Sequence, residues 1–145
     1  MDTGALKDSW AKVAAAGDDV PLYFYSHLFL SHPEVRSMFP IQMSGQRDKL
    51  VTALGAVVSN VDELDKVVPL LEQLGRDHRR FSVVTEHYTA VGASLLATLK
   101  KFLGTSWTPH LADIWAQAYG VVAKVMVAAA EQHEHRGHEH VDRDQ

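Results

Sequence analysis

FYSHLFLSHPEVRSMF, residues 24–39, is the stretch of sequence that decides the fold. Its apolar side chains recur every three or four residues as far as Ser31, which is the spacing of one face of a helix. His32 then precedes Pro33, and the residue before a proline disfavours the helical conformation. A short helical turn around Val35 follows. The stretch therefore predicts a helix, a sharp corner and a second, shorter helix.

Helical spacing continues along most of the 145-residue chain, and no run alternates long enough to predict a strand. Glycines at positions 17 and 104 are placed to end helices. The expected helices are Leu6–Ala15, Asp18–Ser31 with an Asp cap, a short turn at 35–39, Ser44–Asn60, a short turn at Asp62–Val68, a helix from Pro69 through His78, Glu86–Phe102 and a last helix capped by Thr108. Their unequal lengths predict an all-α fold of about seven to eight helices and not a symmetric bundle.

The composition excludes several classes of function. Acidic residues outnumber basic residues by 18 to 14, and the net charge of −4 gives no reason to expect binding to nucleic acid. The absence of cysteine excludes disulfide scaffolds, iron–sulfur clusters, thiolate ligation of haem and cysteine nucleophiles. The redox state of a compartment therefore does not constrain where the protein works.

Neither a leader peptide nor a membrane span is predicted. The N-terminus has no basic region followed by an apolar run, and the most apolar stretch, Ala118–Ala130, is short and interrupted by Lys124. A polar, histidine-rich segment follows at 132–145. We therefore expect one soluble, cytoplasmic domain at 1–131 and a disordered tail at 132–145.

His78 is the first candidate ligand for a metal or a haem iron. It lies four residues after Leu74 and seven after Leu71, so it shares their apolar helix face. An imidazole on such a face can offer a ring nitrogen to iron. The alternative is that RDHRR, residues 76–80, forms a solvated helix end, where the helix dipole favours a histidine. The segment by itself leaves both interpretations open.

Three further side chains could line a ligand site. Tyr25 lies in the middle of an apolar helix, where its hydroxyl needs a partner. Gln46 precedes Leu50 by one helical turn on an apolar face, where a polar amide also needs a partner. Phe39 follows a corner made by proline. Taken singly, the two aromatic residues can belong to the core, and Gln46 can mark the exposed start of a helix.

Together these segments resemble bacterial haemoglobins and the globin domain of flavohaemoglobins. The stretch at 24–39 is similar to theirs, and Gln46 matches a position on their distal helix. His78 and Tyr88, ten residues apart, match their proximal region. IWAQAYGVV at 114–122 resembles their last helix. The resemblance runs through the whole globin domain in the same order and implies a globin fold that encloses a haem pocket.

The resemblance implies haem b (iron protoporphyrin IX) as the cofactor and O₂, NO and CO as small ligands. His78 is expected to bind the iron, with its other ring nitrogen held by the carbonyl of Leu74. Tyr25 and Gln46 are expected to act on the ligand, because a hydroxyl that donates to O₂ favours its retention and an amide can orient that hydroxyl. The other residues expected to contact the cofactor are Phe39, Leu50, Tyr88 and Lys49.

Two features depart from the family pattern. Where the family carries a proximal glutamate on its last helix, this sequence has Ala130, and the nearest carboxylate, Glu131, is rotated by about 100° around a helix. The chain also ends at Gln145, where flavohaemoglobins continue into a flavin and nicotinamide module. We therefore expect a single-domain haemoglobin without strong peroxidase-like chemistry. NO dioxygenation oxidises the iron, so repeated turnover would need a separate reductase.

Several alternatives remain open. One alternative for Lys49 is an ion pair with a haem propionate or an exposed side chain. The other is that its amine, in the neutral form, binds ferric iron as an internal sixth ligand. The tail histidines form a solvated segment or, if extended, bind zinc, copper or nickel; they are His133, His135, His138 and His140. The function is O₂ binding with reaction toward NO, or an O₂ carrier, store or sensor without turnover, or a haem-free helical interaction module. Neither enzymatic turnover nor the oligomeric state follows from the sequence.

Overall fold

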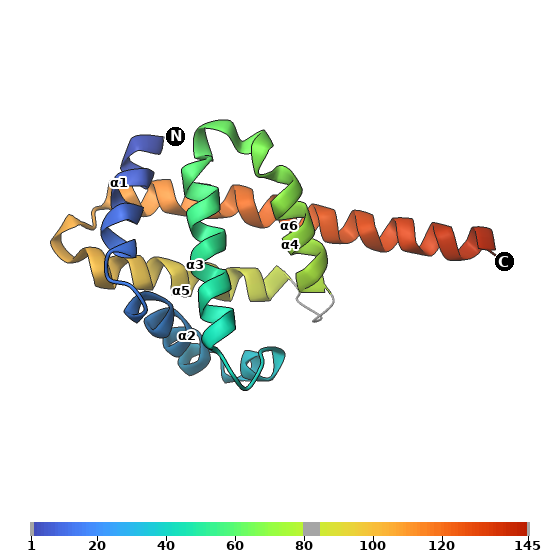
Figure 1. Ribbon diagram of the computed structural model, residues 1–145, viewed down its shortest axis with the longest axis horizontal. Helices are drawn as coiled ribbons and strands as arrows, with labels where there is room; N and C mark the ends of the chain where they lie inside the picture. The colour runs from blue at the N-terminus through green and yellow to red at the C-terminus, as the bar shows by residue number, and fades with distance from the viewer. Residues whose placement is uncertain (1, 80–84, 145) are drawn as a thin grey trace.

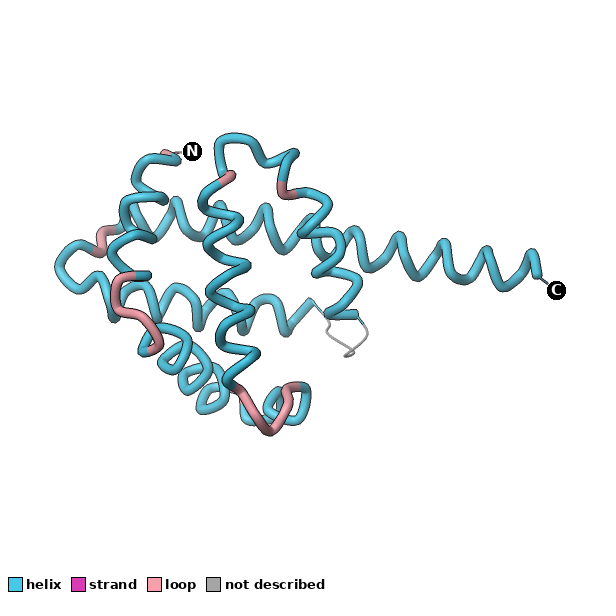
Figure 2. Tube along the Cα trace, viewed as in Figure 1, coloured by secondary structure: helices cyan, strands magenta, loops and turns pink. Residues whose placement is uncertain are grey.

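The computed structural model describes residues 2–79 and 85–144, apart from the side chains at 64, 78, 79, 85 and 130–144. Within these residues the chain forms six α-helices and three short 3-10 helices joined by short loops, without a strand (Figure 2). In chain order they are α1 (Thr3–Ala14), α2 (Asp19–Ser31), η1 (Pro33–Met38), α3 (Ser44–Ser59), η2 (Val61–Lys66), α4 (Val68–Arg79), α5 (Thr85–Leu103), η3 (Gly104–Ser106) and α6 (Pro109–Asp144). The predicted all-α class is confirmed.

The helix ends follow the local sequence, with one correction. Gly17 and Gly104 have φ angles of 67° and 53°, the left-handed region that glycine adopts at low cost. The hydroxyl of Thr108 accepts a hydrogen bond at 3.1 Å from a backbone N–H three residues later and caps α6. The predicted Asp cap of α2 is wrong, because the Asp18 backbone is helical and its side chain makes no capping bond. The Val20 N–H donates instead to the Gly17 carbonyl at 3.2 Å.

Helix α6 extends beyond the boundary that the sequence analysis placed after residue 131. Its backbone is helical to Asp144, where we expected a frayed tail, and Figure 1 shows its last part projecting away from the other helices. The segment has no proline, and Glu139 stands four residues before Arg143, a spacing that supports a helix. The division into a domain at 1–131 and a tail at 132–145 stays a prediction.

Two long helix pairs form the frame of the molecule. Helix α4 packs across α6, α2 packs against α5, and α1 contacts α3, α5 and α6 (Figure 1). The crossing of α4 and α6 is unusually close at Gly75. A Cβ atom added there would lie 2.2 Å from the carbonyl oxygen of Met126. The distance between these two helices therefore depends on a residue without a side chain.

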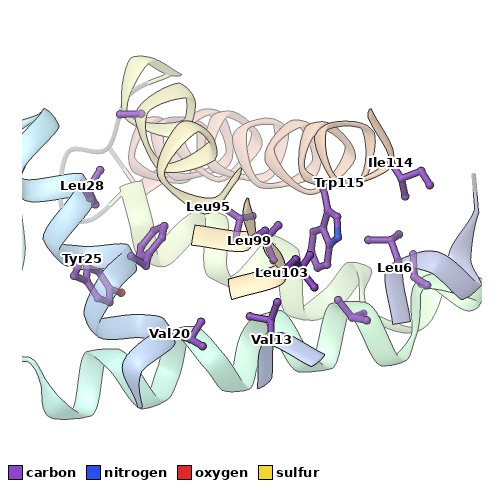
Figure 3. Close-up of a cluster of buried hydrophobic side chains, with 14 of the residues drawn as sticks. Leu6, Val13, Val20, Tyr25, Leu28, Leu95, Leu99, Leu103, Ile114 and Trp115 are labelled. Atoms are coloured by element: carbon purple, nitrogen blue, oxygen red, sulfur yellow. The ribbon is translucent and has the colours of Figure 1, made fainter. Parts of the chain in front are cut away.

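The buried apolar side chains form one large cluster and one small cluster. The large cluster joins α1, α2, α5 and α6, with one residue each from η1, α3 and η2, and Figure 3 shows most of its members. At its centre, Nε1 of Trp115 donates to Oγ of Ser9 at 2.9 Å, so the one polar atom of the indole is paired. The small cluster lies at the crossing of α4 and α6 and consists of Val67, Leu71 and Met126.

The first part of α6 is a long apolar helical segment. Between Pro109 and Ala129 it is long and apolar enough to cross a membrane, a test that core helices of globular proteins also pass. Its Ile114 and Trp115 are buried in the large cluster and Met126 in the small one. Only 22% of this apolar segment is buried, so its place in the core accounts for part of its apolar character.

Candidate functional site

Tyr25 is the buried polar side chain on one side of the candidate site. It comes from α2 and is 6% exposed. Its ring centroid lies 4.9 Å from Phe24 and 5.5 Å from Phe39, both in edge-on contacts, and 5.7 Å from Phe29. Burial raises the pKa of Tyr25, although a hydrogen bond from Gln46 opposes the shift. The hydroxyl therefore keeps its proton at physiological pH and can donate it.

Gln46 reaches that hydroxyl from the first turn of α3. Its Nε2 donates to Oη of Tyr25 at 3.4 Å. Because the phenolic oxygen accepts this bond, the phenolic proton stays available for a third group. This N···O distance of 3.4 Å is longer than the usual range of about 2.7–3.2 Å, so the bond is weak and orients the hydroxyl more than it stabilises the fold. The structure thus brings together the polar pair that the sequence analysis singled out.

Helix α3 presents an apolar face that the neighbouring helices cover only in part. Val58 is its one buried residue among the 16 of the helix, whereas Leu50, Leu54 and Val57 are half-buried. Within the described residues α3 packs on α1 and α2, and α4 packs on α6, but α3 and α4 share little contact. A half-covered apolar helix face opposite a second helix is suited to a large, flat, apolar ligand.

The opposite side of the candidate site is formed by α4, the start of α5 and the middle of α6. Leu74 and Tyr88 are half-buried there and pack against the small cluster of Val67, Leu71 and Met126. Burial raises the pKa of the Tyr88 hydroxyl. This side therefore offers apolar side chains and a protonated phenol.

Tyr119 fixes the start of α5 to α6. Its hydroxyl donates to the carbonyl of Tyr88 at 2.5 Å. Its ring lies against Gly92, where an added Cβ would be only 2.7 Å from Cε2. Burial, and then the nearby phenol of Tyr88, raise the pKa of Tyr119, so its hydroxyl remains a donor. The sequence alone gives no signal for this role of Tyr119, because its partner is a main-chain carbonyl, which every residue type carries.

The structure places the remaining predicted site residues as follows. Phe39 is half-buried beside Tyr25, and Lys49 lies on α3 with an exposed side chain. His78 lies in the last turn of α4, and its side chain is outside the described residues, as are those of Ala130, Glu131 and the tail. Among the described side chains, no three histidines, cysteines or carboxylates are grouped to hold a metal ion.

The globin family model matches residues 22–126 of this sequence. The chain is a globin. The flavohemoprotein of Bacillus subtilis is 34% identical over 114 residues, which cover 77% of this globin and 29% of the relative. The flavohemoprotein of Bordetella parapertussis is 33% identical over 114 residues, which cover 77% and 28%. This globin thus spans less than a third of the length of these relatives.

A solved structure supports the same assignment. A bacterial globin from Campylobacter jejuni superposes with a TM-score of 0.80 at 26% identity, over 90% of this globin and 94% of that chain. The predicted resemblance to bacterial haemoglobins and to the globin part of flavohaemoglobins is therefore confirmed, and so is the predicted globin fold.

Globins are haem-binding proteins, and the described residues of this globin fit a haem. The half-covered apolar face of α3 suits the apolar surface of a macrocycle, and no described charged side chain is buried within that face. The polar pair of Tyr25 and Gln46 stands at its edge with one phenolic proton to donate. Such a donor suits a small, polarisable ligand held next to the macrocycle.

Proposed function

We propose that this globin holds haem b between α3 and α4 and binds O₂ reversibly. When bound, haem supplies a ferrous iron that takes up O₂, NO or CO. His78, in the last turn of α4, is the proposed iron ligand, and the carbonyl of Leu74 is the proposed acceptor for its second ring nitrogen. The main support is the hydrogen bond from Gln46 to Tyr25, because it leaves the phenolic proton available in apolar surroundings.

Each residue at the site has its own proposed role. Tyr25 donates its hydroxyl proton toward the ligand, and Gln46 sets the direction of that hydroxyl. The aromatic ring of Phe39 restricts the tilt of the Tyr25 ring, and Leu50 excludes water from the same side. A donor in such dry surroundings acts more strongly than the same donor in water. Lys49 is exposed, which suits a pair with a haem propionate and not ligation of the iron.

Two functions are compatible with this site. The similarity to flavohemoproteins supports reaction with NO in the cytoplasm, sustained by a separate reductase. The sequence position that the family resemblance assigns to a proximal glutamate holds Ala130, which favours the second candidate, an O₂ carrier, store or sensor without turnover. Sustained consumption of NO by the protein with a reductase and NADH would support the enzyme, and its absence would support the carrier.

The visible spectrum tests the cofactor and its ligand. We expect the purified protein, after haem addition, to give a five-coordinate ferrous form that takes up CO. His78→Ala should abolish this spectrum, whereas His110→Ala, an exposed histidine on α6, should leave it unchanged. An absence of haem bands in the unaltered protein would overturn the proposal. A six-coordinate ferrous form without CO would replace it with internal ligation, with Lys49 as the first candidate.

The rate of O₂ dissociation tests the polar pair. Tyr25→Phe keeps the buried ring and removes the hydroxyl, which is both the donor to the ligand and the acceptor of the Gln46 bond. We therefore expect dissociation to accelerate by roughly five- to a hundred-fold, from a hydrogen bond of about 1–3 kcal/mol. Tyr23→Phe is the matched control, because Tyr23 lies on the same helix but contacts His27 and Phe102 instead. Equal rates in the unaltered protein and the Tyr25 variant would remove Tyr25 from the mechanism.

A further inference from the structure

Arg36 spans the corner between η1 and α3 with four contacts from one guanidinium group. Nη1 donates to the carbonyl oxygens of Phe39 at 3.3 Å and Pro40 at 3.1 Å, and Nη2 donates to that of Ile41 at 3.3 Å. The same group stands over the ring of Phe29, with Cζ 5.1 Å from the ring centroid. All three hydrogen-bond acceptors are main-chain atoms of consecutive residues.

The main chain of this corner needs a hydrogen-bond donor from a side chain, because the backbone stops being helical at Phe39. The backbone there is extended, with φ −115° and ψ 155°, and Pro40 follows without an N–H group. The carbonyls of residues 39–41 are therefore outside any helix. A planar guanidinium group carries five N–H donors in a fixed fork and can bind several carbonyls at once, whereas a lysine ammonium cannot match that geometry.

Two of the residues that Arg36 contacts lie beside Tyr25. Phe39 lies edge-on to Tyr25 at 5.5 Å and to Phe29 at 5.4 Å, and Phe29 in turn lies 5.7 Å from Tyr25. Arg36 contacts two of the three aromatic neighbours of Tyr25, Phe39 through its carbonyl and Phe29 through its ring face. The corner also leads directly into α3, whose first turn carries Gln46.

We propose that Arg36 is a positioning residue for the polar pair. It acts from outside the site: by fixing residues 39–41 and the ring of Phe29, it sets the position of the Tyr25 hydroxyl relative to Gln46, and thereby the retention of the ligand. The proposal rests on the proposed function of Tyr25. It extends that function to a residue that touches neither the ligand nor the cofactor.

The test measures O₂ dissociation from the haem-loaded protein in Arg36→Gln, alone and combined with Tyr25→Phe. We expect Arg36→Gln to accelerate dissociation by about two- to tenfold, less than Tyr25→Phe does, because the hydroxyl is misdirected and not removed. In the Tyr25→Phe background the same change should have no effect. Lys12→Gln, which removes one exposed charge on α1, is the matched control.

Two further measurements separate positioning from a general structural role. Arg36→Lys keeps the charge but loses the fork, so we expect it to restore less than half of the lost retention. The C–O stretching frequency of the CO complex reports the donor directly, and it should move in Arg36→Gln toward the value of Tyr25→Phe. Arg36→Lys also serves if Arg36→Gln does not fold.

The outcomes distinguish this inference from the function on which it rests. If Tyr25→Phe leaves the rate unchanged, the proposed function of Tyr25 fails, and the inference fails with it. If Tyr25→Phe accelerates dissociation and Arg36→Gln does not, only the role of Arg36 is overturned. If Arg36→Gln has the same effect with and without the Tyr25 hydroxyl, Arg36 acts on the fold in general, and positioning is likewise overturned.

Discussion

Gly75 gives the sharpest prediction about how α4 and α6, which form one side of the site, are held together. It is buried in α4, one turn before His78, at the point where α4 crosses α6. An added Cβ would lie 2.2 Å from the carbonyl oxygen of Met126 and 2.8 Å from its carbonyl carbon and Cα. Since these are backbone atoms of a helix, no side-chain rotation can relieve the clash. Gly75→Ala therefore requires α4 and α6 to move apart.

The magnitude follows from two opposing terms. Real contacts to a Cβ are essentially never under 3.0 Å, so the helices must separate by at least about 0.8 Å at this point. Overpacking of this kind costs about 1–3 kcal/mol in the free energy of unfolding. We expect a cost near 3 kcal/mol here, because the added Cβ meets rigid backbone atoms of the other helix. Replacing a glycine inside a helix with alanine returns about 1 kcal/mol through helix propensity. We expect a net loss of about 2 kcal/mol.

Gly120→Ala is the matched control for Gly75→Ala. Gly120 also lies inside a long helix, but no atom lies within 4 Å of an added Cβ. Gly120→Ala should therefore raise the free energy of unfolding by about 1 kcal/mol, because alanine favours the helix more than glycine does and no clash opposes the gain. The difference between the variants, about 3 kcal/mol, then isolates the clash and corresponds to roughly 6–12 °C in Tm for a chain of this size. Urea unfolding of the two variants without haem measures it directly, and equal stabilities would refute the close crossing.

Three further predictions concern the body of the fold. Ser9→Ala should lower the free energy of unfolding by about 1–3 kcal/mol in urea titrations, because it leaves the buried N–H of Trp115 without its acceptor. Tyr119→Phe should cost about 1 kcal/mol in the same assay through its lost bond to α5. Hydrogen bonds from Lys7 and then Thr3 lower the pKa of Asp62, so its contribution to stability is present at pH 7 and lost as the pH falls below the usual carboxyl range. Asp62→Asn should therefore lower Tm at pH 7 but not at about pH 2, and an equal difference at both pH values would contradict this.

Most helix boundaries could be predicted because they depend on local signals. We predicted a helix at Ser44–Asn60, and α3 covers Ser44–Ser59, because the apolar spacing starts and stops there. The turn after Pro33 was predictable because the residue before a proline disfavours the helical conformation. The cap of α2 was not: whether Asp18 caps the helix depends on its backbone angles, and these are set by the turn at Gly17. The residue type alone does not contain that information.

The predictable part of the candidate site consists of side chains that pair with side chains. Tyr25 and Gln46 were singled out as polar groups on apolar faces, and the structure pairs them. The roles of Arg36 and Tyr119 were missed for a shared reason: each residue donates to main-chain carbonyls, which every residue type carries. A sequence-level signal for Arg36 does exist, namely an arginine one turn before a proline corner, but it predicts a contact only once the corner is known.

The apolar face of α3 shows why a ligand site is hard to distinguish from a core by sequence. Leu50, Leu54 and Val57 have the spacing of a buried stripe, and periodicity alone predicts that other helices cover them. In the structure they are half-buried, while Val58 on the same helix is buried. Leu50 and Leu54 pack against the large cluster and Val57 against the small one, and each keeps part of its apolar surface uncovered. An apolar face that the chain covers only in part can bind a further apolar group, and in a globin that group is the haem.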